Sequence, residues 1–496
     1  MLKEKIFDIL GENSGGIYSV GGKGKDYFLE NFDSKTYRKK FSKEIIIKEE
    51  DGLKTELARM LLLEENLIQL TYNVNKETKE LNVFGYLLDK DGKITSERKD
   101  IITASFEKKS RAGYQDIRTS RDGSKLLVCN STYFKKGSDF YQIDLTLYSS
   151  DLEPIIKTTT QVPVGEKTDI SVSNFYVGND GGFFMALTEQ DLEKGVYVTK
   201  KFDIYSYQPY NGFQEEKIEI DLQDKMATSI ALTSDRDGNL IGAGFYGEKY
   251  NAGIFKGVGL AGSYFIKIDP RENKILNSTM QEFSSDFTAR VLKEKKADKG
   301  KLIPNYFTPL EIIGKGDGGA VMISEYQQVV FNSESRVTTY VHGPLAIVDI
   351  MPDGNINWVK PISKNQLYHE KQLALGGFFG GISISFAYTL SFIESQTVYH
   401  SALFGVRGDK LIVMYNDNPD NQEIEHFRDT KKLVGYLKSV PVVVEIDRDG
   451  KMKKSLLEGG KSEVVFRPGV SIQVKQGETI IYGTRRKEEK VGRLTY

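Results

Sequence analysis

Short runs of alternating apolar and polar residues, each ended by Asp, Asn, Gly or Pro, recur along most of the chain. Residues 230–278 show the pattern in full: apolar runs flank a turn at 235–238, and further apolar runs flank a turn at 269–273. Aromatic and β-branched residues between such turn residues are typical of β-strands joined by hairpins. The segment therefore predicts a unit of four antiparallel strands.

The same unit repeats at a nearly constant period. The turn between its first and second strands contains Gly123, Gly181 and Gly238, which are 58 and 57 residues apart. A fixed period with a four-stranded unit is typical of repeat architectures, and small antiparallel sheets bury their faces by packing radially. The chain is therefore predicted to be an all-β protein with a β-propeller fold.

The number of blades follows from the units between the two ends. Six units are expected, at about 53–107, 112–165, 170–223, 228–283, 306–365 and 400–460. Residues 17–47 and 470–496 each hold less than a full unit, so we expect them to form one composite blade that closes the ring. The predicted organisation is an N-terminal extension over residues 1–14 and a single seven-bladed propeller over residues 15–496. Eight blades are the alternative, if residues 366–399 form a divergent blade.

Long connections are concentrated in units four to six. They span residues 246–262, 286–306, 325–343, 366–400 and 416–438. In a propeller, the connections from second to third strand and from one blade to the next emerge on the same face. Long loops inside a compact domain are more often functional than accidental. We therefore predict a loop-rich face that binds another protein.

The longest insertion contains the 22 uncharged residues 372–393. Their number would suit a membrane-spanning helix, but apolar residues alternate with small polar ones from Ile382 to Phe392, which indicates a strand, so no transmembrane span is expected. Two interpretations stay open: a strand or hairpin that covers the propeller, or an apolar docking edge for another protein. The second interpretation predicts that deletion of residues 376–395 abolishes recovery of a partner from a folded ring. The candidate binding residues of the loop-rich face are Tyr246, Tyr250, Phe255, Tyr326, Tyr340, His342, Phe386, Tyr388 and Phe392.

Composition narrows the classes of partner and compartment. The chain has 68 basic and 69 acidic residues, so no field of one sign favours nucleic acid or an anionic membrane. Cys129 is the only cysteine, which excludes an internal disulfide and suits a small buried residue of a strand. A single cysteine is compatible with the cytosol and with many envelope proteins. No secretory signal is visible in residues 1–10, and we expect a periplasmic or cell-surface location with any signal removed.

No motif of an enzyme or a metal site is found in the sequence. The Asp-x-Asp-Gly turns lack the acidic residue that closes a calcium loop, which indicates hairpin turns. The histidines His342, His369, His400 and His426 all lie in the insertions, but without the spacing of metal ligands. The GxSxG motif of serine hydrolases is absent from the sequence. No two acidic residues can be recognised as the carboxylate pair of a glycosidase. We expect no metal, cofactor or catalysis; a carbohydrate-active or other hydrolytic site in the central channel is the alternative.

Two short motifs resemble known propeller repeats. Residues 346–361, AIVDIMPDGNINWVKP, resemble the unit of bacterial β-propeller (SBBP-like) repeat proteins, in which an Asp-Gly turn is followed by a strand ending in Trp. Residues 120–128, SRDGSKLLV, are similar to the WD40-like repeat of TolB-type propellers. The resemblance implies a scaffold or ligand-binding protein of a Bacteroidetes-type cell envelope, with another protein or a membrane-associated complex as partner. It identifies no catalytic residues.

Overall fold

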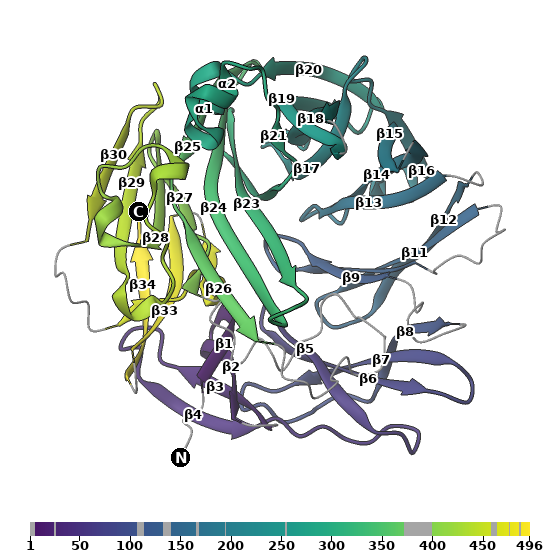
Figure 1. Ribbon diagram of the computed structural model, residues 1–496. Helices are drawn as coiled ribbons and strands as arrows, with labels where there is room; N and C mark the ends of the chain where they lie inside the picture. Colours follow the sequence, from purple (N-terminus) through teal and green to yellow (C-terminus); the bar gives the residue numbers. More distant parts are fainter. Residues whose placement is uncertain are drawn as a thin grey trace.

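The computed structural model describes residues 5–23, 26–106, 114–131, 140–164, 168–193, 195–252, 255–371, 399–457, 464–475, 477–485 and 488–496. These residues form eight antiparallel sheets that follow one another around a ring (Figure 1). Each sheet is a blade, and its strands are arranged in chain order from the centre of the ring outward, except in the last blade. The predicted all-β propeller is therefore confirmed.

The first four blades are regular four-stranded sheets. Their strands are β1 (Lys5–Asn13), β2 (Gly16–Lys23), β3 (Asp26–Phe32) and β4 (Lys39–Glu44); β5 (Thr55–Leu63), β6 (Asn66–Asn75), β7 (Glu80–Leu88) and β8 (Lys99–Ser105); β9 (Tyr114–Thr119), β10 (Lys125–Ser131), β11 (Phe140–Ser149) and β12 (Pro154–Pro163); and β13 (Thr168–Val177), β14 (Phe183–Glu193), β15 (Val196–Tyr207) and β16 (Glu215–Glu219).

The fifth and sixth blades each carry an additional strand, whereas the seventh and eighth have four strands. Their strands are β17 (Met226–Ser234), β18 (Leu240–Ala252), β19 (Phe255–Asp269) and β20 (Lys274–Glu282), with β21 (Ile303–Pro304) added; β22 (Phe307–Gly314), β23 (Ala320–Asn332), β24 (Val337–Ile350) and β25 (Ile356–Ile362), with β26 (Gln366–Lys371) added; β27 (Leu403–Arg407), β28 (Lys410–Asp417), β29 (Val440–Ile446) and β30 (Met452–Leu456); and β31 (Val465–Phe466), β32 (Ile472–Lys475), β33 (Glu478–Arg485) and β34 (Glu488–Thr495). Helices α1 (Ser285–Leu292) and α2 (Glu294–Ala297) connect β20 to β21.

Neighbouring blades share an apolar core, and eight such cores lie between the eight sheets. Strand β10 shows why the central strands have almost uninterrupted apolar runs. Leu126 and Val128 contribute to the core shared with the second blade, whereas Leu127 and Cys129 contribute to the core shared with the fourth. Because successive side chains of a strand point to opposite faces, a sheet between two neighbours must be apolar on both faces.

The turns between first and second strands have the backbone that the repeat predicts. Gly123, Gly181, Gly238 and Gly318 have φ angles of 72°, 91°, 83° and 94°. Such positive angles are strained for residues with a Cβ atom and unstrained for glycine. The repeated Asp-Gly turns therefore end the first strand and start the second at the same place in successive blades.

The predicted count of seven blades is wrong, and so is the predicted composite blade. Residues 5–44 form the complete first sheet, because Lys5–Asn13, assigned to an extension in the sequence, is its innermost strand β1. The C-terminal segment forms a separate sheet, in which β31 and β32 both pair with β33, and β34 pairs along the whole of β33. The eighth blade does not come from residues 366–399 either: β26 joins the sixth sheet, and residues 372–398 lie outside the described residues.

The first and last blades meet through side chains. Ile6 and Ile9 of β1 pack with Ile480 and Tyr482 of β33 in one core. Arg467 donates from Nη1 to the carbonyl oxygen of Ile6 at 2.9 Å. Within the described residues, no strand of the first sheet pairs with a strand of the last. In the described part of the chain, the ring is thus closed by side-chain contacts between the two blades and not by strand pairing.

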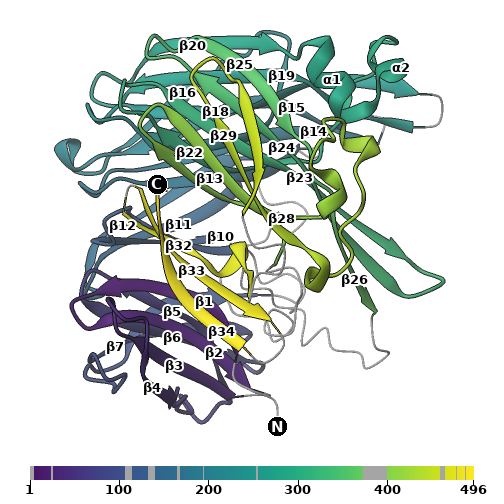
Figure 2. The same cartoon turned by 90° about the vertical axis from the view of Figure 1, so that its left-hand side faces the viewer.

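The additional elements gather on one face of the ring. Figure 2 shows α1, α2, β26 and the far ends of β23 and β24 on the right-hand side of the molecule. Both of the longest hairpins, β18–β19 and β23–β24, connect second to third strands, and α1 and β26 lie in connections between blades. This arrangement agrees with the predicted loop-rich face. No helix within the described ranges has the length and apolar composition that crossing a bilayer would require.

Candidate functional site

The hairpin β23–β24 continues well beyond the sixth blade. Strand β22 pairs with β23 only as far as Tyr326, whereas β24 pairs with β23 as far as Asn332. On the other side, β26 pairs with residues 337–342 of β24. Residues 327–332, 337–342 and 366–371 thus form a three-stranded extension, which we call the ribbon.

The outer strand of the ribbon exposes three consecutive apolar side chains. The exposed fractions are 64% for Val329, 44% for Val330 and 53% for Phe331. Since neighbouring side chains of a strand point to opposite faces, both faces of the ribbon are apolar at this point. Contiguous exposed apolar residues on a folded protein are typical of an interaction site.

The backbone of this strand also has an open edge. The last hydrogen bond on that side is the one that the Gln327 amide donates to the Tyr306 carbonyl oxygen, at 2.8 Å. Backbone groups alternate in direction along a strand, so those of Val329 and Phe331 point to the same side as those of Gln327. Within the described residues, no strand pairs with this edge beyond Gln327. The ribbon can therefore accept a further strand.

A buried ion pair lies at the root of the ribbon. Lys364, which precedes β26, places Nζ 2.5 Å from Oε1 of Glu325 on β23, and both side chains are fully buried. Oε2 of the same carboxylate lies 2.8 Å from Nδ1 of His342 on β24. Lys364 also donates to Oε1 of Gln366 at 3.0 Å. The pair and its hydrogen bonds thus tie together all three strands of the ribbon.

The charge state of the carboxylate follows from its neighbours. Burial alone would raise the pKa of Glu325, but the Lys364 ammonium and His342 outweigh it and lower that pKa to about 2. Burial lowers the pKa of Lys364, and the Glu325 carboxylate opposes this effect. Two acceptors at hydrogen-bond distance from Nζ suit a protonated lysine. The carboxylate is therefore ionised, as a buried ion pair requires.

The network continues from the ribbon into the seventh blade. Gln366 donates from Nε2 to the carbonyl oxygen of Asn416 on β28 at 2.7 Å, and its Oε1 accepts from the Ser401 amide at 2.8 Å. The ring of His400 lies 5.2 Å from that of His342, and burial lowers the pKa of His400 to about 3. His400 is therefore neutral at physiological pH. These contacts fix the ribbon relative to the neighbouring blade.

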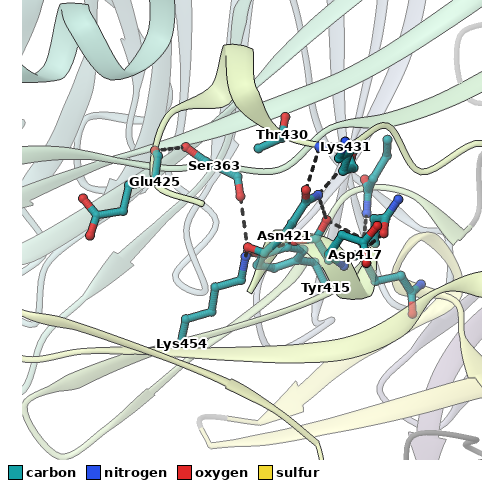
Figure 3. A network of polar contacts seen from close by, with 12 residues as sticks. Ser363, Tyr415, Asp417, Asn421, Glu425, Thr430, Lys431 and Lys454 are labelled. Atoms are coloured by element: carbon teal, nitrogen blue, oxygen red, sulfur yellow. Dashed lines mark hydrogen bonds and ion pairs between the residues drawn. The ribbon is translucent and has the colours of Figure 1, made fainter. Parts of the chain in front are cut away.

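A second polar network holds the loop that follows β28 (Figure 3). Asn421 donates from Nδ2 to Oδ1 of Asp417 at 2.8 Å and to the Lys431 carbonyl oxygen at 2.9 Å, and its Oδ1 accepts from the Lys431 amide at 2.6 Å. Lys454 lies 3.1 Å from Oδ2 of Asp417 and donates to the Asn421 carbonyl oxygen at 2.7 Å. The start and the middle of the loop are thereby held on the seventh blade.

This loop also contacts the ribbon directly. The Leu433 amide donates to the Asn365 carbonyl oxygen at 2.8 Å, and the Leu367 amide donates to the Leu433 carbonyl oxygen at 2.9 Å. Ser363 donates from its hydroxyl to the carbonyl oxygen of Glu425, as Figure 3 shows. Strand β26 is therefore held between β24 and the loop of the seventh blade.

The predicted binding residues fall into three groups according to where they lie in the structure. Tyr340 and His342 lie on the ribbon, where the Tyr340 ring stacks on that of Tyr368. Tyr246 and Tyr326 are buried in the cores of the fourth-to-sixth blades. The side chains of Tyr250 and Phe255 and the residues Phe386, Tyr388 and Phe392 lie outside the described parts of the chain. The predicted binding face as a whole stays a prediction.

Several residues of the site were not singled out in the sequence. Val329, Val330 and Phe331 lie inside the insertion 325–343 and belong to the uncharged run QQVVFNS, which was the available signal. Nothing in the sequence distinguishes Glu325 or Lys364 from the many other acidic and basic residues. Their pairing depends on strands that are neighbours only in the folded chain.

The carboxyl group of Glu311 has a pKa well above that of an ordinary glutamate. Glu311 lies on the innermost strand β22, and burial raises its pKa to about 7, with Arg121 of the third blade opposing the effect. Burial raises the pKa of Tyr496 of the eighth blade, and the Glu311 carboxylate adds to this effect. Within the described residues, no group of three or more His, Cys, Asp or Glu side chains is arranged to hold a metal ion.

The comparisons with known proteins concern the fold. No family model and no curated protein matches the chain. The β-propeller domain of the Trilobed protease from Pyrococcus furiosus is 9% identical with a TM-score of 0.35, over 93% of this chain and 99% of that one. A puromycin hydrolase is 10% identical with a TM-score of 0.36, over 88% of this chain and 53% of that one, so the chain spans about half the length of that enzyme. The WD40 domain of SCAP from fission yeast is 11% identical with a TM-score of 0.21, over 62% and 79%. Likeness at this level of identity concerns the propeller fold alone.

Proposed function

We propose that this propeller is a non-catalytic interaction module that binds another protein through the ribbon on its loop-rich face. The observation that supports this proposal is the exposure of Val329, Val330 and Phe331 along an open strand edge. Covering these side chains would stabilise a complex by on the order of 1 kcal/mol each. The partner strand would also satisfy outward-facing backbone groups.

The root of the ribbon supports the same function. The Glu325–Lys364 pair and the hydrogen bonds of Gln366 fix the three strands relative to the seventh blade. An interaction surface that is already ordered loses less conformational entropy on binding. The rigid root thus favours a binding role for the exposed end.

The cellular location of the protein is also part of the proposal. The resemblance of residues 120–128 and 346–361 to envelope propeller repeats supports an assembly scaffold of the bacterial cell envelope. The partner would then be another envelope protein or a membrane-associated complex.

The test compares two charged substitutions at similarly exposed apolar positions. Phe331→Asp should abolish recovery of the partner that co-purifies with the wild-type protein from its native cells, because a carboxylate cannot be buried against an apolar strand. Leu276→Asp, on β20 with 46% exposure, should leave recovery unchanged. Equal recovery with both variants would contradict the proposal. Deletion of residues 376–395 stays a separate prediction of lost recovery.

A hydrolytic propeller with its site in the channel is the second candidate. Glu311 is the observation in its favour, because a carboxyl group with a pKa of about 7 can act as a general acid at neutral pH. A glycosidase needs a second carboxylate within about 5–10 Å. Hydrolysis of a panel of oligosaccharides by the wild-type protein, lost in Glu311→Gln, would support this candidate; a lack of turnover in both would count against it.

A further inference from the structure

The outermost strands of all eight blades share one protective feature. These strands end the sheets and present unpaired backbone groups to solvent, which makes them potential templates for unwanted pairing. Each of them contains at least one lysine, a residue that opposes edge-to-edge association. The lysines are Lys39, Lys99, Lys157, Lys217, Lys274, Lys360, Lys453 and Lys490, with further ones in β4 and β30.

The open edge of the ribbon lacks this protection. Residues 327–333 of β23 and its turn, QQVVFNS, carry no charge. The comparable extension on the other long hairpin, residues 247–252 of β18, carries Glu248 and Lys249. The ribbon edge thus differs from the outermost strands of the blades and from the extension of the β18–β19 hairpin. An edge without charges is suited to pairing.

We propose that the β23 edge pairs antiparallel with the β23 edge of a second copy of this chain, around a two-fold axis at Val330. The proposal rests on the proposed function of the ribbon as a protein-binding element and names its partner. In this register Val329 of one copy lies opposite Phe331 of the other, and each such pair exchanges both of its backbone hydrogen bonds. The result is one continuous six-stranded ribbon across two molecules, three strands from each.

The chemistry of the edge fits a second copy. Pairing two uncharged strands places no like charges opposite each other, and it brings an aromatic and a β-branched side chain together on the same face, a favourable cross-strand pair. A two-fold axis makes the contact self-complementary and closed, so it ends at a dimer. The net charge of −1 adds little repulsion between copies. Figure 2 shows the end of the ribbon projecting beyond the neighbouring strands, so the two rings need not meet.

The small size of this contact sets its strength. Interfaces at the low end of the size range are weak and reversible. We therefore expect a monomer–dimer equilibrium with a dissociation constant on the order of 100 µM. Such an equilibrium is visible only at high protein concentration.

Sedimentation velocity with the full chain tests the proposal, at concentrations from about 1 to 500 µM that bracket the expected constant. The wild-type protein should shift from monomer to dimer over this range. Phe331→Lys should remain a monomer throughout, because each lysine would lie opposite the apolar Val329 of the other copy and diagonally across the axis from the second lysine. Leu276→Lys, at a similarly exposed position on β20, should dimerise like the wild type.

Amide hydrogen exchange at low and high concentration tests the register. The amides of Val329 and Phe331 should exchange about fourfold more slowly at about 500 µM, where about a quarter of the chains remain monomeric, while that of Val330, which faces β24, should not change. A monomer at every concentration, or a dimer that Phe331→Lys leaves intact, would overturn the proposal.

If the protein is monomeric but Phe331→Asp still abolishes partner recovery, self-pairing is wrong and binding of a different protein through the ribbon stands. If neither occurs, the proposed function fails as well.

Discussion

At the scale of single residues, the Glu325–Lys364 pair is the feature whose burial costs the most free energy. Both side chains are fully buried, and water is replaced by one ion pair and a few hydrogen bonds. Removing charges from water is so costly that a buried pair adds little stability compared with apolar residues of the same size. The pair therefore specifies one position of the ribbon more than it stabilises the fold.

Lys364→Met should destabilise the protein by about 3–5 kcal/mol, because it leaves the Glu325 carboxylate buried without its cation. Combining it with Glu325→Leu should restore most of the loss, since neither charge then remains. Chemical unfolding followed by tryptophan fluorescence at Trp358 of the sixth blade measures both effects. A double variant as unstable as the single one would show that the pair contributes net stability.

Glu311 should make stability depend on pH. Its pKa of about 7 in the folded state lies above the ordinary 4.5, so the folded protein binds the proton more tightly than the unfolded chain. Stability should therefore fall as the pH rises from about 4.5 to about 7, and the loss should persist above that range. Glu311→Gln should raise stability at pH 8 by up to about 3 kcal/mol and leave it unchanged near pH 4.5. Thermal unfolding at the two pH values is the measurement, and an equal effect at both would contradict the assignment.

At the scale of elements, the hairpin turns set the length and start of each strand. Gly238 has a φ of 83°, and a Cβ atom there would meet no other atom within 4 Å. Any cost of a side chain at this position is thus a backbone cost. The same turn type recurs in other blades, which is why the repeat could be recognised in the sequence.

Gly238→Val should destabilise the protein by more than about 1 kcal/mol, because a β-branched residue disfavours a positive φ. The matched control is Gly316→Val, in the corresponding turn of the sixth blade, where there is equally open space and no positive φ. That variant should be close to neutral. Similar unfolding midpoints for both variants would argue against backbone strain as the cause.

Whole elements were predictable where a local pattern produces them. The six internal units agree with sheets two to seven, because strand periodicity and turn residues are properties of neighbouring positions. The ribbon was predicted only as a long insertion. Its strands β24 and β26 pair across the connection of residues 343–365, and no local pattern reports such a pairing.

At the scale of the whole molecule, the ring is completed by contacts between its two ends. Arg493 of β34 lies 2.7 Å from Glu12 of β1 and 2.6 Å from Glu478 of β33. These side chains are largely but not completely buried, so the ion pairs are only partly screened. The pair with Glu12 spans the two blades, and with the apolar core around Ile6 and Tyr482 it holds the first blade against the last.

Arg493→Met should weaken this junction without unfolding the ring. We expect the free energy of local opening at β1 and β34 to fall by about 1 kcal/mol, since Glu12 loses its cation whereas Glu478 keeps Lys475 at 2.9 Å. Amide exchange should become faster in these strands and remain unchanged in β14, on a distant part of the ring. Uniformly faster exchange in every blade would mean that the junction opens only with the whole ring.

The sequence by itself determined that this chain is a ring of small antiparallel sheets and that its additional length is concentrated in the second half. Strands and turns arise from interactions between near neighbours, and these leave a period in the sequence. Only the tertiary structure decided that there are eight blades and that Glu325, His342 and Lys364 meet beneath an exposed apolar edge. The reason is physical: whether a terminal segment completes its own sheet, and which charges share a buried site, depends on the packing of strands far apart in the chain.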